Sequence, residues 1–242
     1  MLAAGLGRRL YGDENLDLPK ALLKFNDVSL IERHIKNLIS LQIEKLTIVV
    51  GHGRNNLMDE VKRVAPPEFV QFIFNPRYRE GPKLSLASAQ KELKSGSDQI
   101  FMDADILYHP TILERLVQSN HDNCFTIDRE FQSSDDYVKV YIKNNRVIDF
   151  GKHSRSDYDF FGEWPGILKL SSEISQKIAI RSEEFVLSGN VLGDYEEIFH
   201  DVVINSPHAT FGAEDISGIP WIEIDNEKDL SKANKIILPL IE

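Results

Sequence analysis

The sequence of 242 residues predicts an α/β fold, in which a mixed and mainly parallel sheet lies between two layers of helices and the second half adds a β-rich extension. In the first half, short apolar runs that end at glycine or acid alternate with stretches whose apolar residues recur at helical spacing, as in βαβ units. In the second half, β-branched and aromatic residues alternate with polar ones, which is typical of strands with one wet face. Together these patterns indicate a three-layer α/β/α arrangement of the Rossmann-like kind.

The elements of the first half follow from apolar spacing and from end signals. The sequence predicts a helix over 30–41, a strand over 45–51, a helix over 55–64, a strand over 70–75, a helix over 84–93 and a buried strand over 99–108. Ser29 is the expected N-cap of the first helix, with Glu32 three positions later as its capping-box partner. Gly51 ends the first strand, and Pro66-Pro67 closes the second helix.

The second half begins with strands and ends with helices. Strands are expected over 124–128, 137–143 and 146–150, helices over 171–181 and about 194–204, a strand over 220–225 and an amphipathic closing helix over 226–238. Asn144-Asn145 supplies a hairpin turn between two of the strands. The chain contains no linker and no repeat, so we expect a single domain over 1–242 in which 124–170 extend the sheet over the same core.

Composition narrows the possible partners. The formal net charge is −10, which opposes nucleic-acid binding by the surface as a whole, while Arg8, Arg9 and Lys20 concentrate positive charge in one region. No apolar run is long enough to span a membrane, and no secretion signal opens the chain. The one cysteine, Cys124, permits no internal disulfide, so we expect a cytoplasmic protein in which this thiol fills the core.

The first ten residues contain the strongest candidate site. Leu2-Ala3-Ala4-Gly5-Leu6-Gly7 combines small residues that let a backbone turn sharply and bring its N–H groups close to a ligand. Arginines follow at positions 8 and 9, and Lys20 follows the next loop, so the stretch predicts a phosphate site. The glycine pattern fits neither the dinucleotide fingerprint nor the Walker A loop, and an ordinary turn explains the glycines alone equally well.

The longer pattern is Leu-Ala-Ala-Gly-x-Gly-x-Arg-Leu over 2–10, followed by Pro-Lys-Ala-Leu over 19–22. It resembles the signature loop of nucleotidyltransferases that activate phosphorylated alcohols and sugar 1-phosphates. The resemblance implies that the triphosphate of an NTP is wrapped by Leu2, Ala3, Ala4, Gly5 and Gly7, and that Arg9 and Lys20 are the catalytic cations at its phosphates. The family usually runs a longer apolar strand into this loop, whereas only Met1 and Leu2 precede it here. We therefore expect either a start site assigned too late or a shortened central strand.

Two acidic positions are candidates for a metal site. Asp103-Ala104-Asp105 follows a buried apolar run, and residues i and i+2 of a strand face the same side, so both carboxylates could reach one ion. Asp225, in Glu223-Ile224-Asp225, could complete the set of oxygen ligands that Mg²⁺ prefers. On spacing alone, an aspartate after a strand also serves as a helix N-cap, and Asp225 would then cap 226–238.

These acids extend the resemblance over most of the chain. Asp-Ala-Asp after the middle strand and Glu-Ile-Asp near the end are similar to bacterial CTP:phosphocholine cytidylyltransferases and inositol-phosphate cytidylyltransferases, as are the segments 48–51, 74–78 and 85–86. By that match Asp105 and Asp225 would hold Mg²⁺, and Asp103 would support the nucleotide site. Ser85 would approach the nucleobase, although a place in the first turn or at the N-cap of the 84–93 helix explains this serine equally well.

The resemblance implies a Mg²⁺-dependent cytidylyltransferase. A phosphate oxygen of the acceptor would attack the α-phosphorus of CTP in line, joining CMP to a phospho-amino-alcohol such as phosphocholine and releasing pyrophosphate. Such a displacement needs positioning and charge neutralisation rather than a protein nucleophile. Residues 1–123 would form the nucleotide-binding half, and 124–242 the acceptor-binding half with its closing helix. A sugar-1-phosphate or polyol-phosphate nucleotidylyltransferase and a non-catalytic nucleotide-sensing module are the alternatives.

The acceptor site is expected around 157–166, where acids and aromatic side chains together suit an ammonium group. The candidate acceptor-binding residues are Tyr78, Glu163, Trp164 and Glu197. A place in the core under the sheet extension is the favoured alternative for Trp164 and its neighbouring phenylalanines. Lys139 and Lys152 could hold the acceptor phosphate or lie at solvated strand edges. The seven histidines show no metal-ligand spacing and are expected to be surface or core residues.

Overall fold

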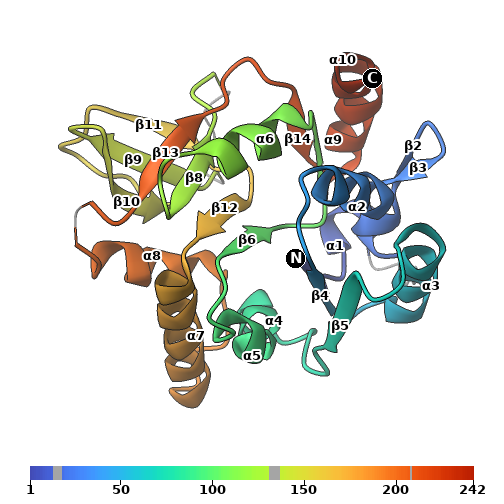
Figure 1. Ribbon diagram of the computed structural model, residues 1–242, viewed down its shortest axis with the longest axis horizontal. Coiled ribbons are helices and arrows are strands. Elements are labelled where there is room, and N and C mark those ends of the chain that lie inside the picture. Colours follow the sequence, from blue (N-terminus) through green and yellow to red (C-terminus); the bar gives the residue numbers. More distant parts are fainter. Residues whose placement is uncertain (13–17, 131–136, 208) are drawn as a thin grey trace.

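The computed structural model describes residues 1–12, 18–130, 137–207 and 209–242 (Figure 1). The strands are β1 (Leu2–Ala3), β2 (Lys24–Phe25), β3 (Val28–Ser29), β4 (Leu46–Val50), β5 (Val70–Phe74), β6 (Gln99–Met102), β7 (Ile106–Tyr108), β8 (Cys124–Ile127), β9 (Lys139–Lys143), β10 (Arg146–Gly151), β11 (Phe160–Glu163), β12 (Ile167–Leu170), β13 (Gly212–Asp215) and β14 (Trp221–Glu223). The helices are α1 (Arg8–Tyr11), α2 (Leu30–Ser40), α3 (Arg54–Val64), α4 (Pro82–Ser88), α5 (Gln90–Leu93), α6 (Thr111–Gln118), α7 (Ser172–Leu187), α8 (Glu196–Ile204), α9 (Glu227–Lys232) and α10 (Leu238–Ile241). Figure 1 shows the N-terminal elements at one end of the molecule, with α9 and α10 beside them, and the strands β8–β13 at the other.

The central sheet consists of two parts that meet at the short strand β1. On one side β1 pairs in parallel with β4, and β4 pairs in parallel with β5. On the other side Leu2 forms a parallel bridge to Asp103, directly after β6, and the sheet continues through β12 and β8 to β13. The order is therefore β5-β4-β1-β6-β12-β8-β13, so β1 carries the N-terminal loop from near the centre of the sheet.

Helices cover both faces of this sheet, which confirms the predicted three-layer α/β/α fold. Neighbouring residues of β6 point to opposite faces, as strand geometry requires. Met102 belongs to the core to which α2, α3 and α6 contribute, and Phe101 belongs to the core formed with α4, α7 and α8. A further sheet, β10-β9-β11, extends this second core, as expected for the β-rich half. Among the described residues, no helix combines the length and the apolar character needed to cross a membrane.

The run over 99–108 is two strands, where we expected one. β6 pairs with β12 and β7 pairs with β14, so the chain changes partner strands at Asp103-Ala104-Asp105. His34 of α2 supports this crossover, with Nε2 3.2 Å from the Ala104 carbonyl oxygen and Nδ1 3.4 Å from the Tyr108 hydroxyl. Burial lowers the pKa of His34 to about 4, although the nearby Asp105 carboxylate favours the charged ring, so the imidazole is neutral at neutral pH.

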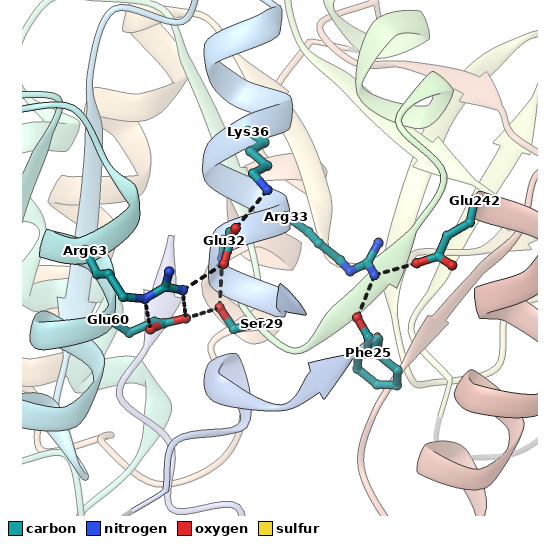
Figure 2. Close-up of polar contacts among 8 residues, drawn as sticks. All are labelled: Phe25, Ser29, Glu32, Arg33, Lys36, Glu60, Arg63 and Glu242. Carbon is teal, nitrogen blue, oxygen red and sulfur yellow. Dashed lines mark hydrogen bonds and ion pairs between the residues drawn. The ribbon is translucent and has the colours of Figure 1, made fainter. Parts of the chain in front are cut away.

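A polar network fixes α2, the helix that carries His34, against α3 (Figure 2). The Ser29 hydroxyl accepts from the Glu32 N–H at 3.2 Å, which confirms the predicted N-cap, and donates to Glu60 of α3 at 2.8 Å. Arg63 of α3 donates to both Glu60 and Glu32 at 2.9 Å. The network therefore holds α2, and with it the imidazole behind the two aspartates, in one orientation.

Other differences from the predicted elements lie at turns and ends. The hairpin turn is confirmed, since Asn144 and Asn145 have φ values of 50° and 59°. The helix over 84–93 divides at Ala89 into α4 and α5, and the closing helix passes through a π-helical turn, Ala233–Ile237, into α10.

The predictions did not include the β2–β3 hairpin, α6, β11, β12 or β13. The short strands among these elements have no clear period, so tertiary contacts decide their conformation. In α6, by contrast, Ile112, Leu113 and Leu116 stand at helical spacing, a signal that the sequence analysis missed.

Candidate active site

A cleft of about 940 Å³ opens where β1, β6 and β14 end. Open α/β sheets place their ligands at the carboxyl ends of strands, so this is where the fold predicts a site. The predicted residues on the cleft wall are Leu2, Ala3, Ala4, Gly5, Gly7, Arg9, Lys20, Tyr78, Ser85, Asp103, Asp105, Glu163, Trp164 and Asp225. The structure thus gathers residues from both ends of the chain at one place.

The two glycines of the N-terminal loop differ in whether the fold would tolerate a side chain at their positions. Gly7 has a φ of +64° and caps α1, and a Cβ there would lie 2.9 Å from the Tyr11 ring. Gly5 is exposed, and a Cβ at this position would meet no atom within 4 Å. The fold therefore requires Gly7. It does not require Gly5, whose backbone borders the open cleft.

Lys20 lies at the centre of the charged cluster. It begins a 3₁₀ turn, Lys20–Leu22, and its Nζ donates to Asp105 Oδ2 at 2.9 Å and to Asp225 Oδ1 at 2.7 Å. Arg9 Nη2 donates to the same oxygen of Asp225 at 2.8 Å. Burial tends to lower the pKa of Lys20, but the carboxylates of Asp105 and Asp225 outweigh it and raise that pKa, so the ammonium group stays charged.

Three carboxylates converge beside this lysine. One oxygen from each of Asp105, Glu223 and Asp225 lies within 4.8 Å of the other two. The Ile224 N–H donates to the Asp105 carbonyl oxygen at 3.0 Å, which sets the two acidic segments side by side. Reduced solvation in the cleft and repulsion from Asp105 and Asp225 raise the pKa of Glu223 well above its usual range. An all-oxygen donor set with accumulated negative charge fits a Mg²⁺ ion.

Glu223 is a member of this cluster that the sequence analysis did not select. The signal was present, because residues 223 and 225 stand at i and i+2 and share one face of an extended segment. The alternative for Asp225, a helix N-cap, is wrong. Asn226 caps α9 and forms a capping box with Asp229, which leaves the Asp225 carboxylate to Lys20 and Arg9.

Asp103 does not belong to the three converging carboxylates. It accepts a short hydrogen bond from the Tyr195 hydroxyl, and burial and the nearby Asp105 raise its pKa well above the usual range. Gly166 has a φ of +82°, and a Cβ there would lie 2.6 Å from Asp103 Oδ2. The expectation that Asp103 and Asp105 share one strand face fails because β6 ends at Met102.

Ser85 and Tyr78 also line the cleft. Ser85 is buried in the middle of α4 and accepts from Asn75 Nδ2 at 3.0 Å. Gly81 is the N-cap of α4, so the interpretation of Ser85 as a cap is wrong. Tyr78 packs on Gly51, where a Cβ would come within 2.6 Å of the tyrosine Cβ. Both side chains are therefore held by the fold at the cleft wall.

The far end of the cleft is acidic. Glu163, at the end of β11, and Glu196, at the start of α8, both line it. Burial, reinforced by the charge of Asp128, raises the pKa of Glu163 to about 7. Burial likewise raises the pKa of Glu196 to about 7, with a contribution from the charge of Asp194. Two carboxyls that are only partly ionised at neutral pH therefore face this end.

Trp164 is a core residue rather than an exposed aromatic face. Only 4% of it is exposed, and its Nε1 donates to the Ile167 carbonyl oxygen at 2.8 Å. Its ring packs among aromatic side chains of the second core, which include Phe101, Phe125 and Phe150. Of the two interpretations that the sequence left open, the structure shows the core one.

Glu197 also differs from its expected place. It pairs with Lys83 at 2.8 Å, and Lys83 is a fully buried side chain that also contacts Asn190 at 3.1 Å. Lys139 is buried in β9, the middle strand of its sheet, so it is not an edge residue. Lys152 does line the cleft and pairs with Asp194 at 2.7 Å. Among these, Lys152 is the one placed to meet an anion in the cleft.

This chain is similar to known proteins over much of its length. The family model of the MobA-like NTP transferase domain matches residues 1–139. CTP:phosphoglutamine cytidylyltransferase of Campylobacter jejuni is 21% identical over 95% of this chain and 96% of its own length. Choline-phosphate cytidylyltransferase of Streptococcus pneumoniae is 26% identical over 98% of this chain and 96% of its own.

A solved structure shows the same fold. The inositol-1-phosphate CTP transferase of T. maritima superposes with a TM-score of 0.73 and 20% identity, covering 99% of this chain and 92% of that one. The family match spans more than half of the chain and contains the glycine loop, Lys20 and Asp105. The chain therefore belongs to the MobA-like NTP transferase domain family and is a nucleotidyltransferase.

Proposed function

We propose that the protein transfers the CMP group of CTP to a small phosphorylated acceptor that carries a positive charge, such as a phospho-amino-alcohol, and releases pyrophosphate. The observation that carries the proposal is the contact of Lys20 with both Asp105 and Asp225. This contact brings cations and carboxylates together at one point. A metal–triphosphate complex needs both, because carboxylates bind the metal ion and cations bind the phosphates. The names of the related cytidylyltransferases support CTP as the donor.

The nucleotide end of the cleft would bind the triphosphate by exchanging contacts. Arg9 and Lys20 would leave the aspartates for the β- and γ-phosphates, and the backbone around Gly5 would approach the phosphates from the other side. Asp105 and Asp225, with Glu223 beside them, would hold Mg²⁺, which neutralises phosphate charge when bound. Asp103 and its partner Tyr195 would support the wall next to the nucleotide, and Ser85 would face the base.

The transfer itself needs no protein nucleophile. An oxygen of the acceptor phosphate forms a bond to the α-phosphorus of CTP, the bond from that phosphorus to the bridging oxygen breaks, and pyrophosphate leaves with the electron pair. Lys20 and Arg9 stabilise the charge that develops on the leaving pyrophosphate. The acceptor phosphate is already ionised at neutral pH, so the step requires no general base.

The acceptor end favours a cation. Glu163 and Glu196 have a pKa of about 7, and a bound ammonium group would draw both toward the charged form. Tyr78 and Tyr195 add aromatic side chains to the lining of the cleft. Lys152 would take the acceptor phosphate. The related phosphoglutamine and choline-phosphate cytidylyltransferases support an acceptor that carries nitrogen.

Pyrophosphate release by the full chain tests the proposal. Each NTP is combined with Mg²⁺ and with phosphocholine, phosphoethanolamine, inositol 1-phosphate or glucose 1-phosphate in turn. We expect turnover with CTP and an amino-alcohol phosphate. Turnover with hexose 1-phosphate alone would replace the acceptor with a sugar, and turnover with another NTP would replace the donor. NTP binding without turnover on the whole panel would favour a nucleotide-sensing module.

A further inference from the structure

A second group of metal-ligating side chains lies outside the residues proposed for catalysis. Asp149 is a buried residue of β10, His153 follows that strand, and His200 lies on α8. His153 Nε2 is 3.0 Å from Asp149 Oδ2, and His200 Nε2 is 3.1 Å from Asp149 Oδ1. Both imidazoles therefore turn the same ring nitrogen toward one carboxylate.

The backbone is shaped to place His153. Gly151 has a φ of +144°, and a Cβ at this position would lie 2.9 Å from Nδ1 of the His153 ring. Tyr141 donates to the His153 carbonyl oxygen at 2.6 Å, and the two rings stack with centroids 6.1 Å apart. A residue with a side chain at 151 would displace the imidazole, so glycine here is needed for the cluster.

The geometry points to a binding site for a divalent transition-metal ion of the Zn²⁺ class, with Asp149, His153 and His200 as its ligands. Their ligand atoms all lie within 4.8 Å of one another. In a tetrahedral shell with bonds of about 2.0–2.1 Å, neighbouring ligand atoms are about 3.3 Å apart, so the nitrogen–oxygen distances need to change little. Two imidazoles and one carboxylate suit Zn²⁺ rather than Mg²⁺, which prefers an all-oxygen shell.

Solvent access and charge set the conditions for binding. The side chains of His153 and His200 are 43% and 33% exposed, whereas that of Asp149 is 6% exposed, so an ion can enter from the imidazole side. Arg155 is the competitor, since its Nη1 donates to Asp149 Oδ2 at 2.7 Å. An entering ion would displace this guanidinium, whose side chain is 36% exposed and can move into water.

The ion would join the segment after β10 to α8, and both lead to the acceptor end of the cleft. Lys152, next to His153, pairs with Asp194 at 2.7 Å, and Glu196 at the start of α8 lines the cleft. Holding His153 and His200 together would therefore stiffen that wall. The role is one of positioning, because neither histidine is among the residues proposed to touch the substrates.

Zinc binding by the full chain in excess Mg²⁺ tests the inference, since Mg²⁺ saturates an all-oxygen site. We expect one Zn²⁺ per chain by equilibrium dialysis with metal analysis, and a higher Tm that returns to its starting value with EDTA. His153→Gln and His200→Gln should each weaken Zn²⁺ binding by at least about tenfold. Arg155→Gln should tighten it, because the competing guanidinium is gone.

His121→Gln is the matched control, because His121 is exposed and lies outside the cluster. Its Zn²⁺ affinity should equal that of the wild type. Equal affinity in wild type, His153→Gln and His200→Gln would overturn the site, and so would an absence of Zn²⁺ uptake below the millimolar range. If His200→Gln does not fold, His153→Gln and Arg155→Gln, whose side chains are more exposed, decide the question.

Discussion

The two ends of the cleft hold their charges in opposite ways. At the nucleotide end, Lys20 and Arg9 are already paired with Asp105 and Asp225, so a triphosphate would exchange one set of ionic contacts for another. At the acceptor end, burial raises the pKa of Glu163 to about 7, so this carboxyl is about half protonated at neutral pH. The nucleotide end is therefore charge-balanced before its ligand enters. At the acceptor end, the carboxyl becomes fully ionised only when a cationic ligand binds.

The aspartates carry the largest expected effect. Asp105→Asn and Asp225→Asn each remove a negative charge from the proposed metal site, so kcat for pyrophosphate release should fall roughly a thousandfold or more. Steady-state assays with saturating CTP and acceptor measure this, with circular dichroism to confirm folding. Asp59→Asn is the control, since this exposed aspartate lies on α3, and it should match the wild type. Activity within a few-fold of wild type in Asp105→Asn would remove that residue from the metal site.

Lys20 tests whether the nucleotide end is balanced in advance. Lys20→Met should lower kcat/KM by about 10²–10³, because the phosphates lose their central cation. Without Mg²⁺ it should also lower the Tm, since Asp105, Glu223 and Asp225 would then repel one another. Adding Mg²⁺ should raise the Tm of Lys20→Met by more than that of the wild type. If Mg²⁺ raised the Tm of both proteins by the same amount, Lys20 would not be neutralising the carboxylates in place of the metal ion.

Substitutions at the two loop glycines should distinguish an effect on stability from an effect on CTP binding at the nucleotide end. Gly7→Ala should destabilise the protein by about 1 kcal/mol or more, because position 7 has a φ of +64° and its Cβ would crowd Tyr11. Gly5→Ala should leave the Tm unchanged and raise KM for CTP several-fold, because its Cβ would project into open space beside the cleft. Thermal unfolding and steady-state kinetics of both variants measure this. An unchanged KM in Gly5→Ala would remove that position from the phosphate site.

The sequence predicted the nucleotide end better than the acceptor end, and the reason is physical. Phosphate binding uses a short contiguous segment, residues 2–9, whose small residues and cations stand together in the sequence, so the whole motif can be compared with a family signature. Asp225 needed a resemblance, since spacing also allowed a helix cap, and the structure excludes the cap because Asn226 takes that place. The strand break between Asp103 and Asp105 could not be predicted, because it depends on the pairing of β6 and β7 with distant strands.

At the acceptor end, the residues come from elements far apart in sequence, so no local period shows which of the candidates come together. Glu163 and Glu196 lie on β11 and α8, and it is the tertiary fold that brings both to the cleft. Trp164 illustrates the same limit, since its sequence neighbours are compatible with an aromatic binding face as well as with a buried core. The cluster of Asp149, His153 and His200 also spans distant positions, and a search for metal-ligand spacing does not find it.

A change of pH should have the smallest effect of these experiments. It tests most directly whether the acceptor end differs from the nucleotide end in how it holds its charge. Glu163 and Glu196 have a raised pKa of about 7, so both are mostly neutral below that pH and ionised above it. A cationic acceptor binds the ionised form, so KM for phosphocholine should fall by roughly fivefold to tenfold as pH rises through this range. KM for CTP should change much less, because Lys20 has a raised pKa and stays charged throughout.

The acceptor phosphate also titrates near this range, so phosphocholine must be compared with its carbon isostere, in which a neutral tert-butyl group replaces the trimethylammonium. Both compounds carry the same phosphate, and the ratio of their KM values therefore reports the ammonium group alone. This ratio should change with pH in the wild type and change less in Glu163→Gln, which cannot ionise. A ratio that stays constant with pH in the wild type would mean that the two carboxyls do not hold the cation, and the acceptor end would then be no different in principle from the nucleotide end.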